Sequence, residues 1–360
     1  RRFGIIFRLK NVFPPPTQEP EMVNVEFSQE PIKPNSSRRP RPRRKKLYRI
    51  ANWPAYNAGL KARGRIGFWL APEVLAAWSY HGPRQRGGAY QYSDEAIETG
   101  LILRLVFHLA WRQIQGFLES IFARLGSTLR VPDYTTLARR SSTLLPSLDA
   151  AIADEPLHVV IDATGLKVFG EGEWKVRQHS YSKRRTWRKV HIALDTATGQ
   201  AVGHTLTSNQ VDDASQVAAL IEQITGSIEA VGADGAYDKR KVFSYLENPP
   251  TGTAIRAIIP PRKDALIEQH GNRKEAPLPR DAILRTIRKK GRIGWKMQAG
   301  YHLRSLVETF MGRYKQIIGN TLRARKKPQQ DSESRIGCLI LNRMLQIAKP
   351  QSYVIESEDG

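Results

Sequence analysis

The chain has 360 residues, 40% of them apolar and 8% aromatic, which is enough for two or three domains or one large domain with an appendage. Its net charge of +23 favours a polyanionic partner, with nucleic acid ranked before an anionic membrane. The single cysteine, Cys338, excludes a disulfide framework and fits a reducing cytosol. No run of 18 uncharged apolar residues is present, so we expect no membrane segment.

Residues 1–46 predict a disordered, proline-rich basic tail, because eight prolines lie between residues 11 and 46 among few apolar residues. The junction with the folded region, RRPRPRRKKLYR at residues 38–49, has eight basic residues and no acid. A solvated run of charges is one interpretation. An arm that follows DNA phosphates is the interpretation that we favour.

Residues 47–150 predict a helical domain. Ser93 can cap a first helix, Gly126 can end a second, and a third begins near Asp133. The third is expected to carry leucines on one side and arginines elsewhere: Leu137, Leu144 and Leu145, with Arg139 and Arg140. Three such helices fit a helix-turn-helix module that reads DNA with its last helix, and they fit a bundle packed on the main domain equally well.

Beyond residue 155 the pattern changes to strands alternating with helices. The expected strands are Leu157–Ile161, Val190–Leu194, Ala201–Leu206, Ala230–Ala233 and Ala254–Ile259. The expected helices cover residues 212–224, 239–246 and 302–319, with a basic, irregular segment at 262–300. This order predicts an α/β, ribonuclease-H-like domain over residues 151–350, with a mixed sheet flanked by helices, followed by a tail at 351–360.

Two acids follow strands of this sheet: Asp162 comes after the first strand, and Asp234 after the fourth. Two neighbouring strand ends would place their carboxylates close together, where a divalent cation relieves the repulsion. Oxygen ligands suit Mg²⁺ or Mn²⁺. Each aspartate taken alone is more often a turn residue or a helix cap. Asp212, Asp213 and Asp238 are interpreted as helix-starting residues.

The third acid is expected on the long helix. At about 100° per residue, Tyr301, Arg304, Glu308 and Lys315 fall on one stripe about 60° wide, beside the apolar face. Glu308 can then lean towards the two aspartates, and Lys315, about 10 Å further along, can hold a phosphate near the cut bond. The competing interpretation is a solvated face of ion pairs.

The spacing Tyr301-x2-Arg304-x3-Glu308-x6-Lys315 resembles the signature around the catalytic glutamate of insertion-sequence transposases of the DDE class, in the insertion-sequence-four and insertion-sequence-five families. The segments VIDATGLKVFGEGEWK, GADGAYDKR and LVETFMGRYKQIIG resemble the insertion-sequence-five pattern around all three acids, and the resemblance covers residues 47–349. Glu308 follows Asp234 by 74 positions, which leaves no room for a large β insertion and favours the insertion-sequence-five side.

The resemblance implies that Asp162, Asp234 and Glu308 bind two Mg²⁺ or Mn²⁺ ions, and that Tyr301, Arg304 and Lys315 support DNA binding near the cut. It implies an enzyme that binds the terminal inverted repeats of its element, cleaves there and joins the 3′-OH to target DNA. The expected setting is double-stranded DNA in a bacterial cytoplasm, with a homo-oligomer on the DNA and neither a membrane nor a nucleotide cofactor.

A basic stretch around the first acid is interpreted as a DNA-contacting loop, since aromatic residues are interleaved with its cations. Its cations include Lys183, Arg184, Arg185, Arg188 and Lys189, and its aromatic residues are Trp174, Tyr181 and Trp187. An exposed lysine-rich hairpin is the alternative. His179 and His191 are interpreted as structural.

Two rival functions stay open. One is a ribonuclease-H-like nuclease that cuts without joining strands. The other is a non-catalytic DNA-binding protein derived from a transposase, which the complete acidic triad disfavours.

Overall fold

The computed structural model describes residues 47–83, 90–151, 155–169, 187–269 and 278–355. The chain divides into two compact units, and the one at residues 48–355 contains nearly all of these residues. The expected tail at 1–46 lies outside the described residues. Within the described ranges no helix combines the length and the apolar character that a bilayer span requires.

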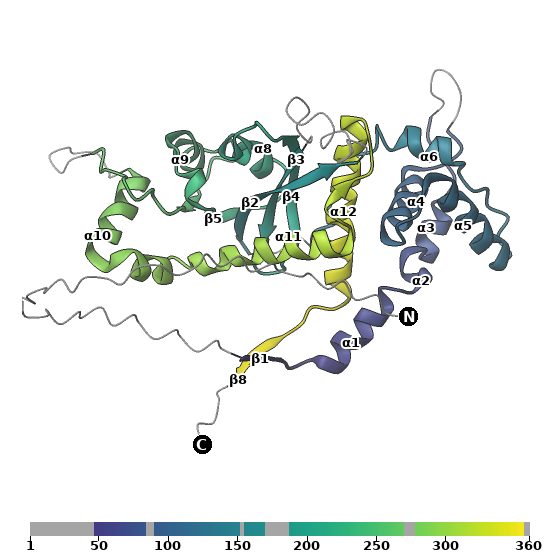
Figure 1. The fold of residues 1–360 in the computed structure, drawn as a ribbon, viewed down its shortest axis with the longest axis horizontal. Helices are drawn as coiled ribbons and strands as arrows, with labels where there is room; N and C mark the ends of the chain where they lie inside the picture. Colours follow the sequence, from purple (N-terminus) through teal and green to yellow (C-terminus); the bar gives the residue numbers. More distant parts are fainter. Residues whose placement is uncertain (1–46, 84–89, 152–154, 170–186, 270–277, 356–360) are drawn as a thin grey trace, which may run out of the picture. The chain divides into compact units, whose positions relative to one another are not determined.

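The main sheet is mixed and has the strand order β4-β3-β2-β5-β6, with the short β7 pairing with β2 (Figure 1). The strands are β2 (Leu157–Val168), β3 (Trp187–Asp195), β4 (Ala201–Ser208), β5 (Ile228–Gly232), β6 (Arg256–Ile258) and β7 (Thr321–Leu322). Strands β2, β3 and β4 are antiparallel neighbours, whereas β5 is parallel to β2 and β6 is parallel to β5. The expected mixed sheet with an antiparallel start is confirmed.

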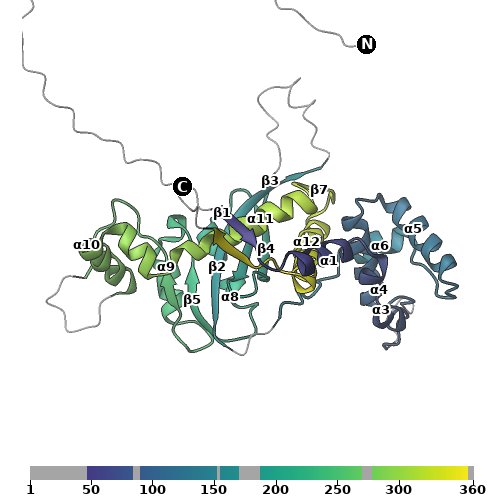
Figure 2. The same cartoon turned by 90° about the horizontal axis from the view of Figure 1, so that it is seen from below.

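Helices cover both faces of this sheet. They are α8 (Val217–Ile221), α9 (Arg240–Glu247), α10 (Pro279–Gln298), α11 (Ser305–Ile317) and α12 (Lys327–Ile347), with short 3-10 turns η1 (Asp213–Gln216), η2 (Gly235–Tyr237) and η3 (Tyr301–Arg304). Alternate residues of β2 enter opposite cores: Val160 packs with α11 and α12, while Val159 and Ile161 pack with α8, α9 and α10. Helix α11 lies against β2, and α12 against β4 (Figure 2).

The region before the sheet is helical, as expected. Its helices are α1 (Trp53–Ala62), α2 (Ile66–Trp69), α3 (Pro72–Ala76), α4 (Asp94–Val106), α5 (Trp111–Arg124) and α6 (Tyr134–Arg140). The Ser93 hydroxyl accepts a hydrogen bond from the Ala96 N–H, and the Asp133 carboxylate accepts from Thr135 and Thr136, so both expected N-caps are confirmed. Gly126, just past α5, has φ of 62°, a left-handed conformation that ends the helix.

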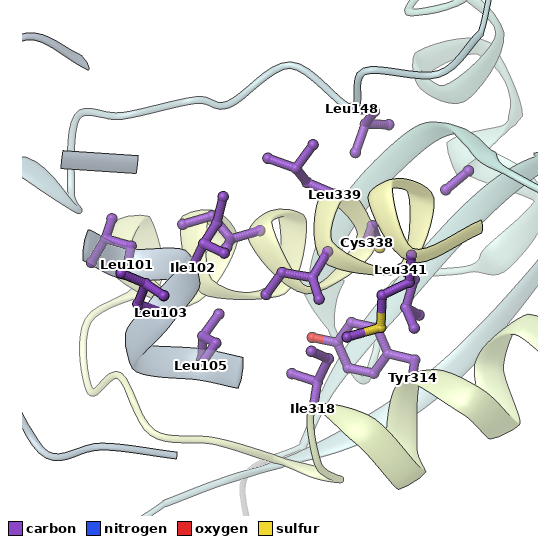
Figure 3. Close-up of a cluster of buried hydrophobic side chains, with 14 of the residues drawn as sticks. Leu101, Ile102, Leu103, Leu105, Leu148, Tyr314, Ile318, Cys338, Leu339 and Leu341 are labelled. Carbon is purple, nitrogen blue, oxygen red and sulfur yellow. The ribbon is translucent and has the colours of Figure 1, made fainter. Parts of the chain in front are cut away.

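One apolar core joins the helical region to the sheet. Side chains of α4 such as Leu101 and Leu105 lie in the same cluster as Leu339 and Leu341 of α12 and Tyr314 of α11 (Figure 3). Helix α12 contacts both α4 and β4. The expected boundary near residue 150 therefore marks a change of secondary structure inside one shared core, and α4 is packed as a bundle helix.

Several sequence predictions are wrong in detail. Helix α6 ends at Arg140, so Leu144 and Leu145 lie beyond it, and Leu145 is 75% exposed instead of sharing an apolar face. The segment expected to be irregular contains α10, which is bent at Gly291, where φ is 73°. Part of the expected C-terminal tail forms β8 (Ser352–Ile355), which pairs with β1 (Leu47–Ile50).

Two buried histidines predict an acid-sensitive fold. Burial lowers the pKa of His191 to about 4 and that of His204 to about 3. An unfolded histidine titrates near pH 6.5, so the stability that depends on the neutral imidazoles is complete above pH 6.5 and is lost as the pH falls towards these values. At pH 5 each histidine should lower the free energy of unfolding by about 2 kcal/mol.

This expectation is measured by urea unfolding at pH 7 and pH 5. His204→Gln removes the titrating group while retaining a donor for Ser334, which lies 3.0 Å from His204 Nε2, and should therefore reduce the stability difference between the two pH values. His81→Gln, at an exposed histidine, is the control. If the stability difference between pH 7 and pH 5 is the same in His204→Gln as in the wild type, His204 is not a source of the acid sensitivity.

Candidate active site

Asp162 lies inside a strand. The sequence predicted that this strand ends at Ile161. Strand β2 continues to Val168, because its pairing with β3 extends from Val159 to Lys167. The parallel pairing with β5 ends earlier, at Val160 and Gly232. Asp162 therefore lies just past the point where β5 leaves the sheet. Its side chain is 19% exposed, and its Oδ1 accepts a hydrogen bond of 2.8 Å from the Ala163 N–H.

Asp234 lies two residues after the end of β5 and begins η2. Its Oδ1 accepts a hydrogen bond of 2.8 Å from the Ala236 N–H, so the same side chain also caps this turn. Because β2 and β5 are parallel neighbours, Asp162 and Asp234 lie at the same edge of the sheet. The negative charge of Asp234 raises the pKa of Asp162, which agrees with this proximity.

Glu308 lies in the first turn of α11, and Arg304 connects it to Asp162. One guanidinium nitrogen of Arg304 is 3.2 Å from Asp162 Oδ2, and the other is 2.5 Å from Glu308 Oε1. The Glu308 side chain is 53% exposed, and among the described residues its carboxylate pairs with Arg304 alone. Arg304 thus lies between the first and third acids of the predicted triad.

The pKa of Asp162 reflects this arrangement. Burial raises the pKa of the Asp162 carboxyl, and the Ala163 N–H and the positive charge of Arg304 lower it. The negative charges of Asp234 and Glu308 raise it further. Three acids therefore share one electrostatic environment, which a positive charge stabilises.

The three acids determine which metal ion could bind at this site. All three acids offer oxygen ligands, which are the donors that Mg²⁺ and Mn²⁺ prefer. In the part of the chain that the structure describes, no three His, Cys, Asp or Glu side chains lie close enough together to hold a metal ion. The chemistry of the donors fits such an ion, while Arg304 supplies the positive charge between two of them.

Tyr301 and Arg304 do not lie on the long helix that the sequence predicted. They form η3, which follows Gly300 with φ of 71°, and α11 begins only at Ser305. Turn η3 contacts β2 and β5. Packing on the sheet edge, and not one continuous helix, therefore positions Tyr301 and Arg304. The Tyr301 ring is half-buried, with Lys296 Nζ 4.8 Å and the Arg304 guanidinium carbon 5.9 Å from its centroid. Burial raises the pKa of Tyr301.

Lys315 is an exposed member of the signature, as Glu308 is. It lies in the last turn of α11, seven residues or about 10 Å beyond Glu308 along the helix axis. Its ammonium group makes no hydrogen bond or ion pair with the described residues, so this side chain is available to an external anion.

The other predicted DNA contacts fall into three groups. Lys183, Arg184 and Arg185 lie outside the described residues, as does His179. Arg188 donates to Gln330 at 2.9 Å, and Lys189 donates to Asp213 at 2.8 Å, so both cations have partners within the chain. Arg140 pairs with Asp94 and lies over the Tyr90 ring at 4.2 Å, whereas Arg139 is exposed.

A cluster beside the triad was not assigned to the site from the sequence. Tyr237 is 1% exposed, and burial together with the charges of Asp162, Asp213, Asp234 and Asp212 raises its pKa. Its hydroxyl has no hydrogen-bond partner among the described residues. The segment GADGAYD contains this tyrosine three residues after Asp234. Only the fold brings Asp212 and Asp213 near Tyr237.

His191 is structural in this arrangement, as the sequence indicated. It is fully buried, its Nε2 lies 2.8 Å from Thr207 Oγ1, and its Nδ1 lies 3.9 Å from Asp213 Oδ1. Its lowered pKa of about 4 keeps it neutral at physiological pH.

Comparison with known proteins gives the family. Two models described as a transposase DDE domain match residues 61–171 and residues 153–343, and the second match covers more than half of the chain. A cryo-electron-microscopy structure of the piggyBac transposase synaptic complex with hairpin DNA matches 80% of this chain and 74% of that chain, at 9% identity and a TM-score of 0.34. On the strength of the family matches, the chain belongs to the DDE transposase domain family.

Proposed function

We propose that the chain is a DNA transposase of the insertion-sequence-five type, with a ribonuclease-H-like catalytic domain. It would bind the terminal inverted repeats of its element, cleave at the ends and join the freed 3′-OH to target DNA. The observation that carries the proposal is the meeting of Asp162 and Asp234 at one sheet edge, with Glu308 joined to Asp162 through Arg304.

Asp162, Asp234 and Glu308 would hold two Mg²⁺ or Mn²⁺ ions, in line with the use of divalent ions by this family. Bound ions supply activation of water and stabilisation of the charge that develops on the leaving oxygen. In the first step a water oxygen bonds to phosphorus as the bond to the 3′ oxygen breaks. In the second, the freed 3′-OH attacks a target phosphodiester and releases a target 3′-OH, so the protein forms no covalent intermediate.

The partner that fits the charge is double-stranded DNA, both element ends and target. A net charge of +23 favours long-range attraction to phosphates. Two element ends and one target must meet for strand transfer, so we propose a homo-oligomer on DNA in a bacterial cytoplasm.

The test uses a labelled duplex carrying the inverted repeat that flanks the gene, with Mg²⁺. The proposal expects cleavage by the wild type and none by Asp162→Asn. A pre-cleaved 3′-OH end should also be joined into a plasmid. Cleavage without joining would identify a nuclease instead, and binding without either reaction would identify a non-catalytic DNA-binding protein.

Lys315 gives a separate prediction about DNA. Lys315→Ala should weaken binding of the end duplex by about 1 to 3 kcal/mol, the loss typical of a charged hydrogen bond to phosphate. The Mg²⁺ concentration for half-maximal cleavage should stay the same, because Lys315 is about 10 Å along the helix from Glu308. Lys315→Arg should keep part of the activity.

The measurement is an Mg²⁺ titration of cleavage beside a binding curve in EDTA. A large shift of the Mg²⁺ requirement in Lys315→Ala with intact end affinity would show that this lysine supports the metal ligands instead of DNA.

A further inference from the structure

A groove lies on the helical region, away from the residues assigned to the acid triad. It is lined by the first turn of α5, by both ends of α6 and by the start of α12, and its volume is about 770 Å³. We call it the basic groove, defined by Arg112, Arg139, Lys326, Trp111 and Tyr134. Its walls come from segments about 200 residues apart in the sequence, which the shared core of α4 and α12 holds together.

The charge of the basic groove is one-sided. Three cations line it, Arg112, Arg139 and Lys326, and all three are exposed, while no Asp or Glu is among its lining residues. The first turns of α5 and α12 contain no acid either. No carboxylate pairs with these three cations within the described residues.

The neighbouring cations make the contrast clear. Arg140, next to Arg139, pairs with Asp94, and Lys327, next to Lys326, pairs with Asp331 at 2.5 Å. At both places the residue that faces the groove has no acidic partner within the described part of the chain, while the adjacent residue has one. Three cations without such a partner therefore line one groove.

Aromatic side chains form part of the lining. The Arg112 guanidinium carbon lies 5.1 Å from the centroid of the Tyr134 ring, and that of Arg104 lies 4.0 Å from the centroid of the Trp111 ring. These contacts hold the rings in place and leave both Trp111 and Tyr134 half-buried. A flat, half-exposed ring beside cations suits a sugar or a base edge next to a phosphate.

The exposure of the cations favours a polymer over a small anion. Exposed charges are screened and bind a single anion weakly. Several exposed cations gain affinity for DNA because each neutralised phosphate releases condensed counterions. The groove thus fits a chain of phosphates better than one phosphate.

We propose that the basic groove binds the sugar–phosphate backbone of DNA, at a contact separate from the acid triad. This inference rests on the proposed function and assigns to it a second DNA surface. It also assigns Arg139 to backbone binding, in place of the base reading expected from a recognition helix, so the contact should not depend on DNA sequence.

The test compares two triple variants with the same change of charge. The groove variant is Arg112→Gln, Arg139→Gln and Lys326→Gln, and the control is Lys61→Gln, Arg65→Gln and Arg124→Gln, which removes exposed cations of the same region that do not line the groove. Fluorescence anisotropy measures binding of the inverted-repeat duplex and of a scrambled duplex in EDTA, over a series of KCl concentrations.

The slope of log K against log salt should become shallower by about 2 to 3 in the groove variant, since each lost phosphate contact contributes about 0.9. The change should be the same on both duplexes, and the control slope should stay near that of the wild type. Thermal unfolding of both variants checks the fold, and Lys326→Gln alone should lower the slope by about 0.9 if the triple variant is unstable.

Equal slopes in the groove variant and the wild type would overturn the inference. A loss confined to the inverted-repeat duplex would also overturn it, because it would indicate base reading. Failure of the proposed function is seen elsewhere, as binding by the wild type without Mg²⁺-dependent cleavage, so the two failures are distinguishable.

Discussion

Neutralising any one acid of the triad should abolish strand cleavage and leave DNA binding intact. Asp162→Asn, Asp234→Asn and Glu308→Gln each keep the size of the side chain and remove its charge. Cleavage should fall below a few per cent of the wild-type rate, because the reaction needs the charge that these acids hold at the sheet edge. Binding in EDTA should change by less than about twofold, since phosphate contacts supply most of the affinity.

A labelled end duplex, resolved by gel after incubation with Mg²⁺, measures cleavage, and anisotropy in EDTA measures binding. Asp264→Asn is the matched control, because this aspartate is exposed and distant in sequence from all three acids. Residual cleavage well above a few per cent in Asp234→Asn would remove that residue from the site. Its hydrogen bond to the Ala236 N–H would then be its only role, as a cap of η2.

Local signals in the sequence were sufficient for three helix ends, although the end of α6 and the start of α11 were predicted wrongly. Ser93, Asp133 and Gly126 act within three residues of their own position, so a cap or a left-handed glycine can be recognised without knowing the fold. Strands β2 to β6 were also found, because β-branched apolar runs are a local pattern, whereas the two-residue β7 was not predicted. Their extent was not, since the polar half of β2 is a strand only through its pairing with β3.

The missed helices have a different cause. In α10 the apolar residues that face the core, such as Ile283, Leu284 and Trp295, are separated by many cations, and Gly291 interrupts the helical period. Pro279 at its first turn and Asp281 after it were usable signals of a helix start. Helix α12 is buried over most of its circumference, so it lacks the one-sided pattern on which the prediction depended.

The sequence singled out Asp162, Asp234 and Glu308 through the ends of apolar runs and a helical wheel, although Asp162 lies inside β2 and not at its end. The contact of Arg304 with two of these acids was not predicted. Arg304 is 142 residues from Asp162, and a helical wheel places it on the same stripe as Glu308 without indicating which carboxylates it joins. In the structure Arg304 lies between two acids, and its expected contact with DNA stays a prediction.

This geometry makes Arg304 a positioning residue with a large expected effect. In Arg304→Gln the half-exposed Glu308 loses the contact that orients its carboxylate, and Asp162 loses the cation that offsets the charges of its two neighbours. Cleavage should fall by about 10- to 100-fold, as is typical when a residue that orients a ligand is removed. Arg304→Lys should recover little, because one ammonium group cannot bridge two carboxylates in the way that a planar guanidinium does.

An Mg²⁺ titration separates this role from direct DNA binding. If Arg304 orients Glu308, the Mg²⁺ concentration for half-maximal cleavage should rise in Arg304→Gln while binding in EDTA stays near that of the wild type. Lys315→Ala should show the reverse pattern, with weaker binding and an unchanged Mg²⁺ requirement. Full activity in Arg304→Lys, or a loss of DNA affinity in Arg304→Gln with an unchanged Mg²⁺ requirement, would assign Arg304 to phosphate instead. Arg304 ends η3 and Lys315 lies in the last turn of α11, so this pair of titrations tests how the function changes along this segment from the acids to DNA.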